Sequence, residues 1–440
     1  MKQIIIFLLI LCPLLTIAND GRKLDVTEYT LENGLHVILH KNSSAPNVVV
    51  GVKYHVGSKN EDQGLTGFAH FFEHLSFHGS ENIPQGEFDN YVIAAGGYDN
   101  AYTTYDVTYY YELLPAHEYK LGLWLESERM LHPIISEEGI NREREVVKEE
   151  KRMRYDNSPL GNVYNDLFLN SFQRHPYKHA IIGSMEDLNT ASIGDFKNFF
   201  ETYYVPNNAC LVVAGDIDIK ETKKWISYYF DDIPKGKKIE RPIYDEQRPG
   251  KEVVIEKMTK GIKKTHVAMS YFTAPENTQD GKIIKVISLL LSTNGNDSYL
   301  EKNITGIDNP VSKKIVASDE LYEQAGLLFI RANVAEGKSK KELICAIDQE
   351  LQKLIDNPVP EMDLQKVKNR LKSGFIDLDY DMRTVADFLT SYHHIWGDAS
   401  RYNTTIQEYM AITTEDIQRV ARKYLNPENR TIIIYYPENK

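Results

Sequence analysis

The feature that most constrains the fold is a pattern that occurs twice, at residues 190–213 and again at residues 413–434. Each copy contains a capped helical stretch, a turn with Pro and Asn, and an apolar strand. Because the second copy comes about half the chain later, the pattern predicts two copies of one fold. The chain has 440 residues, of which 42% are hydrophobic. That length is sufficient for two hydrophobic cores.

Between the two copies lies a segment rich in charge, Pro and Gly, residues 233–251, which we interpret as a linker. Residues 48–52 and 98–114 are expected to form strands, whereas residues 64–77 and 137–155 are expected to form helices. Helices and strands are mixed without a regular βαβ alternation. The pattern therefore favours an α+β fold over a doubly wound parallel sheet.

Residues 1–18 have the pattern of a secretory signal peptide, with an apolar run at Ile4–Leu15 followed by small residues. The run is too short to remain as a membrane-spanning helix, and no later stretch approaches about 18 consecutive apolar residues. We therefore expect a mature chain without a transmembrane segment that is exported to the periplasm or secreted. A lipoprotein signal at Cys12 is a weaker alternative, because the two residues before it are not small.

The charge balance limits the classes of partner. The chain has 51 Lys and Arg against 63 Asp and Glu, a formal net charge of −12. An acidic chain is not expected to bind nucleic acid. The acidity would suit attraction of basic peptides, but it fits a solvated surface equally well.

Three cysteines are present, and Cys12 would leave with the signal peptide. Cys210 and Cys345 both lie among apolar residues, so we expect two buried free thiols, with a single disulfide as the alternative. Neither has the spacing of a zinc ligand.

The residues with the clearest chemical meaning are His70, Glu73 and His74. On a helix, this spacing places all three side chains on one face. Two imidazoles could then bind one Zn²⁺ ion, and the carboxylate could serve as the general base for a water that the ion activates. Histidines on the surface of an amphipathic helix are the alternative, since 13 histidines in this length allow such a spacing by chance.

A second helical stretch offers further carboxylates. Glu143 and Glu150 are seven residues apart, and so lie on one face of the predicted helix. Glu150 could complete a site of two histidines and one glutamate. Most glutamates on a charged helix are solvated, however, and the spacing alone does not distinguish Glu150 from its neighbours.

Together these motifs resemble those of the pitrilysin-like, or inverzincin, metallopeptidases, which include insulin-degrading enzyme and the mitochondrial processing peptidase. The resemblance covers much of the first half of the chain, in the expected order; it runs through residues 70–74, 77–80, 96–103, 143–150, 175–177, 182–183 and 204–208. It implies two homologous domains, each a mainly antiparallel sheet covered by helices. We expect a catalytic domain at residues 19–235, a linker at 236–251 and an inactive domain at 252–440.

The resemblance also implies roles for individual residues. Glu150 matches the third metal ligand, and Glu143 matches a supporting carboxylate of the catalytic site. Asn100, Ala101 and Tyr102 match the edge strand that binds an extended peptide by β-addition. The expected activity is therefore zinc-dependent endopeptidase cleavage of extended peptides or unfolded segments, inside a chamber formed by two closing halves.

The chain departs from the family pattern in its second half. Many members carry an Arg and a Tyr there that hold the substrate, but residues 298–317 have Lys302 near the Arg position and no clear Tyr. Short members of the family usually assemble from two halves of this size. We therefore expect a dimer in which a second pitrilysin-like subunit supplies the missing pair.

Two other functions compete with this interpretation. The chain could be a non-catalytic or substrate-presenting subunit, although such subunits have typically lost part of the metal motif. It could also be a zinc hydrolase that acts on a non-peptide substrate, against which the edge-strand match argues.

Five other histidines are not expected to bind the metal, and four of them, His175, His179, His393 and His394, are interpreted as structural. His78 lies too close to the metal motif to add a ligand without closing the open position, and a role at the rim is expected. Pro176 disfavours helical geometry at His175, so its ring need not share a face with that of His179. The adjacent residues His393 and His394 would point in different directions on a helix.

Overall fold

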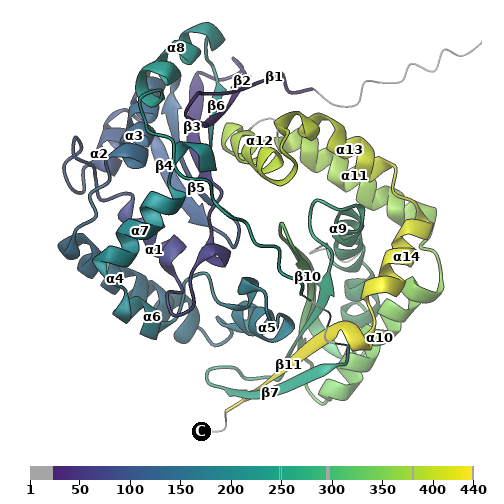
Figure 1. Cartoon of the computed structure of the whole chain (residues 1–440). Helices are drawn as coiled ribbons and strands as arrows, with labels where there is room; N and C mark the ends of the chain where they lie inside the picture. The colour runs from purple at the N-terminus through teal and green to yellow at the C-terminus, as the bar shows by residue number, and fades with distance from the viewer. Residues whose placement is uncertain (1–22, 247, 249, 294–297, 379–380, 439–440) are drawn as a thin grey trace, which may run out of the picture.

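The computed structural model describes residues 23–438, apart from 247, 249, 294–297 and 379–380 (Figure 1). The predicted signal peptide at residues 1–18 and Cys12 lie outside the described residues. Within them, no helix has the length and apolar character needed to cross a membrane.

The first half of the chain contains six strands and eight α-helices among the described residues. The strands are β1 (Val26–Thr30), β2 (His36–Lys41), β3 (Asn47–Tyr54), β4 (Tyr98–Thr103), β5 (Thr108–Pro115) and β6 (Ala209–Gly215). The helices are α1 (Phe68–Leu75), α2 (Phe88–Ala94), α3 (Tyr119–Leu131), α4 (Glu137–Lys151), α5 (Val163–Ser171), α6 (Met185–Thr190), α7 (Ile193–Tyr203) and α8 (Ile219–Phe230).

The second half contains five strands and six α-helices in the part that the structure describes. The strands are β7 (Val253–Thr259), β8 (His266–Thr273), β9 (Ser312–Leu321), β10 (Gly326–Val334) and β11 (Arg430–Pro437). The helices are α9 (Gln279–Leu291), α10 (Lys340–Asp356), α11 (Glu361–Leu378), α12 (Met382–Trp396), α13 (Tyr402–Met410) and α14 (Thr414–Tyr424).

Each half forms one mixed, mainly antiparallel sheet. The strand orders are β1-β2-β6-β3-β5-β4 and β7-β11-β8-β10-β9, and only the pairs β2–β6 and β7–β11 are parallel. Two similar sheets covered by helices confirm the predicted α+β class. Between α8 and β7 the described residues form no helix or strand; the exact domain boundaries at 236–251 remain a prediction.

The repeated sequence pattern forms the same structure in both halves. Ser192 and Thr413 cap α7 and α14 through capping boxes, in which the cap side chain accepts a hydrogen bond from the backbone of the third helical residue. After each helix, an equivalent asparagine donates a side-chain hydrogen bond to the carbonyl of the last helical residue, at 2.8 Å for Asn208 and 2.7 Å for Asn429. The repeat therefore encodes a helix, its turn and the strand that follows.

The two halves exchange helices. One face of the first sheet packs against α12, which buries Val385 and Leu389 on Val49 and Val212. In return, α5 from the first half covers one face of the second sheet, as Figure 1 shows. One apolar face of each sheet is therefore covered by a helix from the other half. For this reason the two halves depend on each other for stability.

One predicted strand is in fact a hairpin. Residues 98–114 were expected to form a single strand, but β4 and β5 are antiparallel neighbours joined at residues 104–107. The chain reverses there because the Thr104 hydroxyl accepts hydrogen bonds from the backbone N–H groups of Asp106 and Val107. The turn makes β4 an edge strand.

Three buried charged side chains lie together between β5 of the first sheet and α3. Arg129 on α3 is 3.2 Å from Glu112 on β5 and 3.4 Å from Glu126, and all three side chains are almost fully excluded from solvent. The two cysteines among the described residues, Cys210 and Cys345, are free, as predicted. Cys210 is buried, but Cys345 is exposed on α10, so the prediction that both thiols are buried is wrong for Cys345.

Candidate metal centre

The short helix α1 presents the histidine motif because its other face is fully apolar. Its buried residues, Phe68, Ala69, Phe71, Phe72 and Leu75, pack into the core of the first half. The Phe68 ring stacks on Phe196 of α7, with ring centroids 4.5 Å apart. The polar residues of α1 therefore face away from the core.

The start of α1 depends on a glycine. Gly67 precedes the helix with φ of 93°, a left-handed conformation that side chains with a Cβ rarely adopt. A Cβ at this position would also come within 2.7 Å of the carbonyl oxygen of Ile182. The helix therefore begins at Phe68, later than the predicted residue 64.

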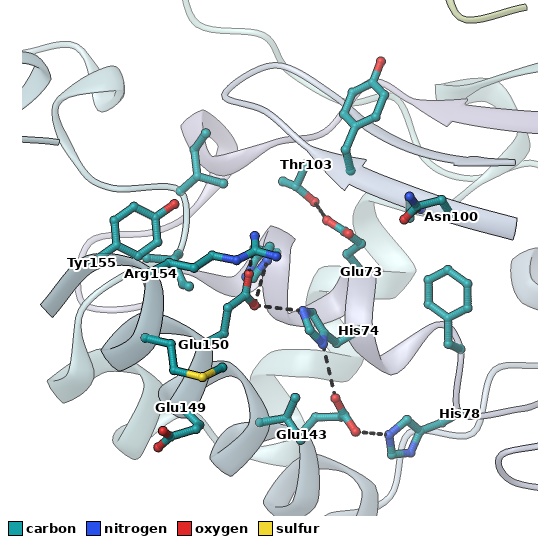
Figure 2. A pocket seen from close by; sticks show the side chains of 18 residues that line it. Glu73, His74, His78, Asn100, Thr103, Glu143, Glu149, Glu150, Arg154 and Tyr155 are labelled. Carbon is teal, nitrogen blue, oxygen red and sulfur yellow. Dashed lines mark hydrogen bonds and ion pairs between the residues drawn. The ribbon is translucent and has the colours of Figure 1, made fainter. Parts of the chain in front are cut away.

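The carboxylates come from α4, which contacts α1. Ser136 caps α4 by accepting a hydrogen bond from the backbone of Gly139, and Ile140 and Val147 anchor its buried face. Glu143 and Glu150 project toward the histidines, as the seven-residue spacing predicted (Figure 2). The neighbouring Glu149 is largely exposed and forms an ion pair with Arg152, directly after the end of α4.

His70, His74 and Glu150 converge on one point. Glu150 Oε2 lies 3.6 Å from His70 Nε2 and 3.3 Å from His74 Nε2. This oxygen is buried and has no hydrogen-bond partner among the described residues. An ion about 2 Å from each ligand atom would satisfy all three, and two imidazoles with one carboxylate form a donor set typical of catalytic zinc.

The electrostatics favour a positive charge between the two helices. Burial lowers the pKa of His70 to about 4, with the neighbouring His74 adding to the effect. Burial also opposes charge on His74, but the nearby carboxylates of Glu143 and Glu150 outweigh it and raise the pKa of His74 to about 9. Without an ion, a proton on His74 would supply the positive charge that these carboxylates stabilise.

Glu143 contacts one member of the His70, His74 and Glu150 cluster without belonging to the cluster itself. It lies 3.3 Å from His74 Nδ1, the ring nitrogen opposite the one that faces Glu150. Its other oxygen is 2.6 Å from His78 Nε2. Burial opposes ionisation of Glu143, but these two contacts outweigh burial and lower its pKa to about 2. His78 therefore supports the site through Glu143, a role more specific than the expected position at the rim.

Glu73 lies on the open side of the same helix and contacts β4. The Thr103 hydroxyl donates a hydrogen bond to Glu73 Oε2 at 2.5 Å. Burial raises the pKa of Glu73, and the Thr103 bond offsets part of that rise. The sequence interpretation included Thr103 in the matched segment at 96–103 but did not predict its contact with Glu73, because that contact depends on the register and facing of β4.

A cavity of about 840 Å³ opens over these residues, between α1, α4 and β4. Asn100, Ala101, Tyr102 and Thr103 all line it. The Tyr102 hydroxyl, however, donates to Asp387 of α12, on the opposite side of the strand from Glu73. Of the expected substrate-binding residues, Tyr102 can therefore offer its backbone but not its hydroxyl.

The second half contributes no residue to this cavity among those described. Lys302, near the expected Arg position, is an exposed residue of a short π-helical turn at Glu301–Thr305.

The contacts of His175 and His179 fit the structural interpretation: His175 is buried and caps the turn after it, and His179 lies 2.8 Å from the carbonyl oxygen of Ser58.

Two family models match the chain. Residues 36–184 match the model described as insulinase (peptidase family M16), and residues 190–371 match the peptidase M16 inactive domain. The first match includes every residue of the cavity described above.

Individual relatives match nearly the whole chain. The zinc protease PqqE of Helicobacter pylori is 30% identical over 93% of this chain and 92% of its own length. A probable mitochondrial-processing peptidase subunit beta of Arabidopsis thaliana is 24% identical over 90% of this chain and 75% of its own. The crystal structure of a protease from Helicobacter pylori superposes with a TM-score of 0.89, at 28% identity, over 94% of this chain and all of that one.

Proposed function

Because this chain belongs to the M16 family of peptidases, we propose that it is a zinc-dependent endopeptidase that cleaves extended peptides or unfolded segments. The observation that carries the proposal is the convergence of His70 and His74 on the unpartnered oxygen of Glu150, with Glu73 on the same face of α1. In that arrangement His70, His74 and Glu150 would hold the ion.

Zn²⁺ bound there would lower the pKa of a water to about 7 and polarise the carbonyl of the scissile bond. Glu73 accepts the proton of the attacking water at Oε1, the oxygen that Thr103 leaves free. It then delivers that proton to the leaving amine. Burial favours this exchange, because a raised pKa allows the carboxyl group of Glu73 to hold the proton between the two steps.

The edge strand β4 is proposed to bind the peptide backbone. Among the described strands it pairs only with β5, so its outer edge is open to an added strand, although the backbone N–H of Ala101 already donates a hydrogen bond to Oδ1 of Asn100. Asn100 and Ala101 line the cavity beside Thr103, close to Glu73. Recognition through the backbone suits substrates of varied sequence that are unfolded at the site of cleavage.

The test combines zinc analysis with cleavage of unstructured peptides by wild type and by Glu73→Gln. The variant should retain zinc and lose cleavage, since it keeps the proposed ligands and removes the base. Glu149→Gln is the matched control, because Glu149 lines the same cavity but pairs with Arg152. Cleavage that survives in Glu73→Gln at the wild-type rate would overturn the proposal.

The same assays separate two other functions. A non-catalytic subunit would bind zinc weakly or not at all and would leave peptides intact in the presence of any partner. A zinc hydrolase for another substrate class would retain zinc in both variants, but would hydrolyse small amides or esters in preference to peptides.

We propose further that the chain works as the catalytic half of a dimer. The support is that residues 298–317 contain no Arg, and no Tyr after Lys302, the residue nearest the expected Arg; in addition, one relative is itself named as a subunit of a processing peptidase. Export to the periplasm or the exterior is proposed from the apolar run at Ile4–Leu15. Full peptidase activity of the isolated monomer would contradict the dimer.

A further inference from the structure

A second cluster of metal-binding side chains lies where α12 crosses the first sheet, and it does not include the residues of the proposed catalytic centre. Glu28 on β1 and His36 on β2 come from adjacent antiparallel strands. The third member, His393, comes from α12 in the second half. One ligand atom from each residue lies within 4.8 Å of the others, as is also the case for His70, His74 and Glu150.

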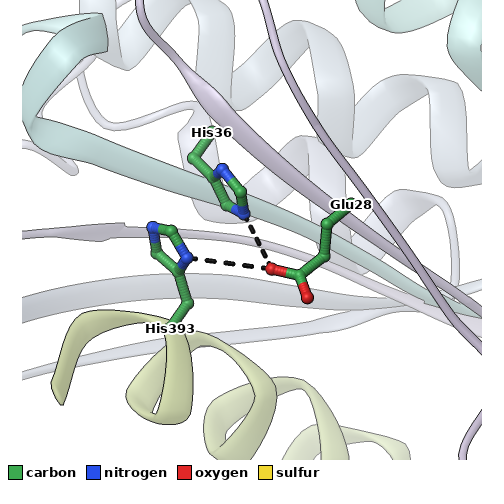
Figure 3. Close-up of side chains that lie close together, drawn as sticks. All are labelled: Glu28, His36 and His393. Atoms are coloured by element: carbon green, nitrogen blue, oxygen red, sulfur yellow. Dashed lines mark hydrogen bonds and ion pairs between the residues drawn. The ribbon is translucent and has the colours of Figure 1, made fainter. Parts of the chain in front are cut away.

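The three side chains point toward one another, as Figure 3 shows. Glu28 Oε2 lies 3.0 Å from His36 Nε2 and 3.8 Å from His393 Nδ1. The two imidazole rings are stacked, with centroids 3.6 Å apart and planes 7° from parallel. The two nitrogens that face Glu28, His36 Nε2 and His393 Nδ1, therefore lie on the same side of the stacked rings, next to one carboxylate oxygen.

Both facing nitrogens can offer a lone pair. His36 Nδ1 is 3.2 Å from the Thr30 hydroxyl, so a proton on Nδ1 would be shared with Thr30 and leave Nε2 free to bind a metal. His393 Nδ1 is buried without a hydrogen-bond partner among the described residues. Buried polar atoms are normally satisfied, so this one indicates a missing partner.

A neighbouring cluster is a poorer candidate. His55, His394 and Glu323 also lie close together, and His55 Nε2 is 3.0 Å from Glu323. There, however, the ammonium group of Lys59 forms ion pairs with both Glu323 and Asp106. A cation is already present, so a divalent ion would be repelled. Among the ion pairs described for Glu28, no Lys or Arg takes part.

We propose that Glu28, His36 and His393 form a second metal site, which binds Zn²⁺ or a similar divalent transition metal and links the two halves of the chain. Two imidazoles and a carboxylate suit such ions. The side chains are 22%, 18% and 25% exposed, so an ion can enter and a solvent molecule can complete its coordination. Because the two ring planes are nearly parallel, the lone pairs of the two nitrogens do not point at one common position. Both rings therefore tilt toward the ion when it binds.

The position of the site gives it a structural role. The metal would bind two strands of the first sheet to the helix from the second half that covers that sheet. Metal that binds only the folded state would stabilise this junction by an amount that grows with the logarithm of the free-metal concentration once that concentration exceeds Kd. The site would then resist separation of the halves without taking part in the proposed cleavage chemistry.

The test uses the full chain with the proposed catalytic ligands removed, His70→Ala/His74→Ala. After metal is stripped, Zn²⁺ is titrated by calorimetry and by competition with a chromophoric chelator. The protein should still bind one equivalent of Zn²⁺, and its melting temperature should rise with added Zn²⁺. Adding Glu28→Gln or His393→Gln should weaken binding by roughly tenfold or more and abolish the rise.

His117→Gln is the control, since this histidine is 79% exposed and lies outside the cluster. It should change neither the stoichiometry nor the melting temperature. If the double alanine variant does not fold, wild type and Glu28→Gln are compared instead, with two equivalents of Zn²⁺ expected against one. A single equivalent in wild type, or binding that neither Glu28→Gln nor His393→Gln weakens, would overturn the second site.

Discussion

Thr103→Val tests the role of Glu73 through its acid–base chemistry. Valine has nearly the shape of threonine but cannot donate the hydrogen bond that Thr103 makes to Glu73 Oε2 at 2.5 Å. Burial already raises the pKa of Glu73, and the Thr103 bond counteracts that rise by stabilising the charged form. Removing the donor therefore raises the pKa of Glu73 further.

The size of the effect follows from the bond that is lost. A hydrogen bond to a charged group contributes about 1.5–3 kcal/mol. A general base must be ionised to accept a proton, so below the pKa of Glu73 the ionised fraction should fall by about 10- to 150-fold, since 1.36 kcal/mol corresponds to a factor of ten. The acid limb of the profile of kcat/KM against pH should move to higher pH. At pH values above the raised pKa of Glu73, the activity of the variant should return toward that of wild type.

The measurement is kcat/KM for an unstructured peptide across pH, with zinc content measured for each variant. Thr103→Ser keeps the hydroxyl, and so should keep the wild-type acid limb. An unchanged acid limb in Thr103→Val, or an equal shift in Thr103→Ser, would refute the assignment of Glu73 as the base. A loss of zinc in Thr103→Val would indicate instead that the substitution disturbs α1.

Three further predictions follow from contacts outside the cleavage chemistry. Glu143→Gln should weaken zinc affinity by roughly 10- to 100-fold in chelator competition, because Glu143 orients His74 without lying in the metal cluster. Arg129→Met should lower the free energy of unfolding by about 3–5 kcal/mol in urea titrations, since it leaves two buried carboxylates unpaired. The loss should grow as pH rises, because burial raises the pKa of both carboxyls and the unfolded state then binds fewer protons than the folded state. Cys345 should react with a thiol reagent in the native protein, whereas Cys210, which is buried and has a raised pKa, should react only on unfolding.

The sequence predicted those parts of the fold that local patterns encode. The repeated capped helix, turn and strand were visible because capping boxes and a Pro/Asn turn recur at fixed spacing. The hairpin of β4 and β5 was missed, since its turn uses the Thr104 hydroxyl instead of the usual Gly or Pro. The exchange of α5 and α12 depends on packing between distant segments, and no local pattern specifies it.

The residues of the candidate site also differ in whether a local sequence pattern could predict them. His70, Glu73 and His74 follow from helical geometry alone, whereas Glu150 could be chosen from the neighbouring glutamates only through the family resemblance. The contact of Thr103 with Glu73 depends on strand register, which composition does not determine. His393 was interpreted as structural because the adjacent His394 would point in a different direction on a helix; its contact with Glu28, more than 300 residues away in the sequence, is not visible in any local pattern.

The exchange of helices leads to a final prediction about the halves themselves. Cutting the chain within residues 236–251 leaves the backbone of both sheets intact, but removes α12 from the first fragment and α5 from the second. Each fragment alone would expose the apolar face that the exchanged helix covers, including Val49 and Val212 in the first. Co-expressed fragments should therefore copurify as a folded pair, while each fragment alone should aggregate or remain unfolded. A soluble, monomeric first fragment with a cooperative unfolding transition would show that the exchange is not needed for stability.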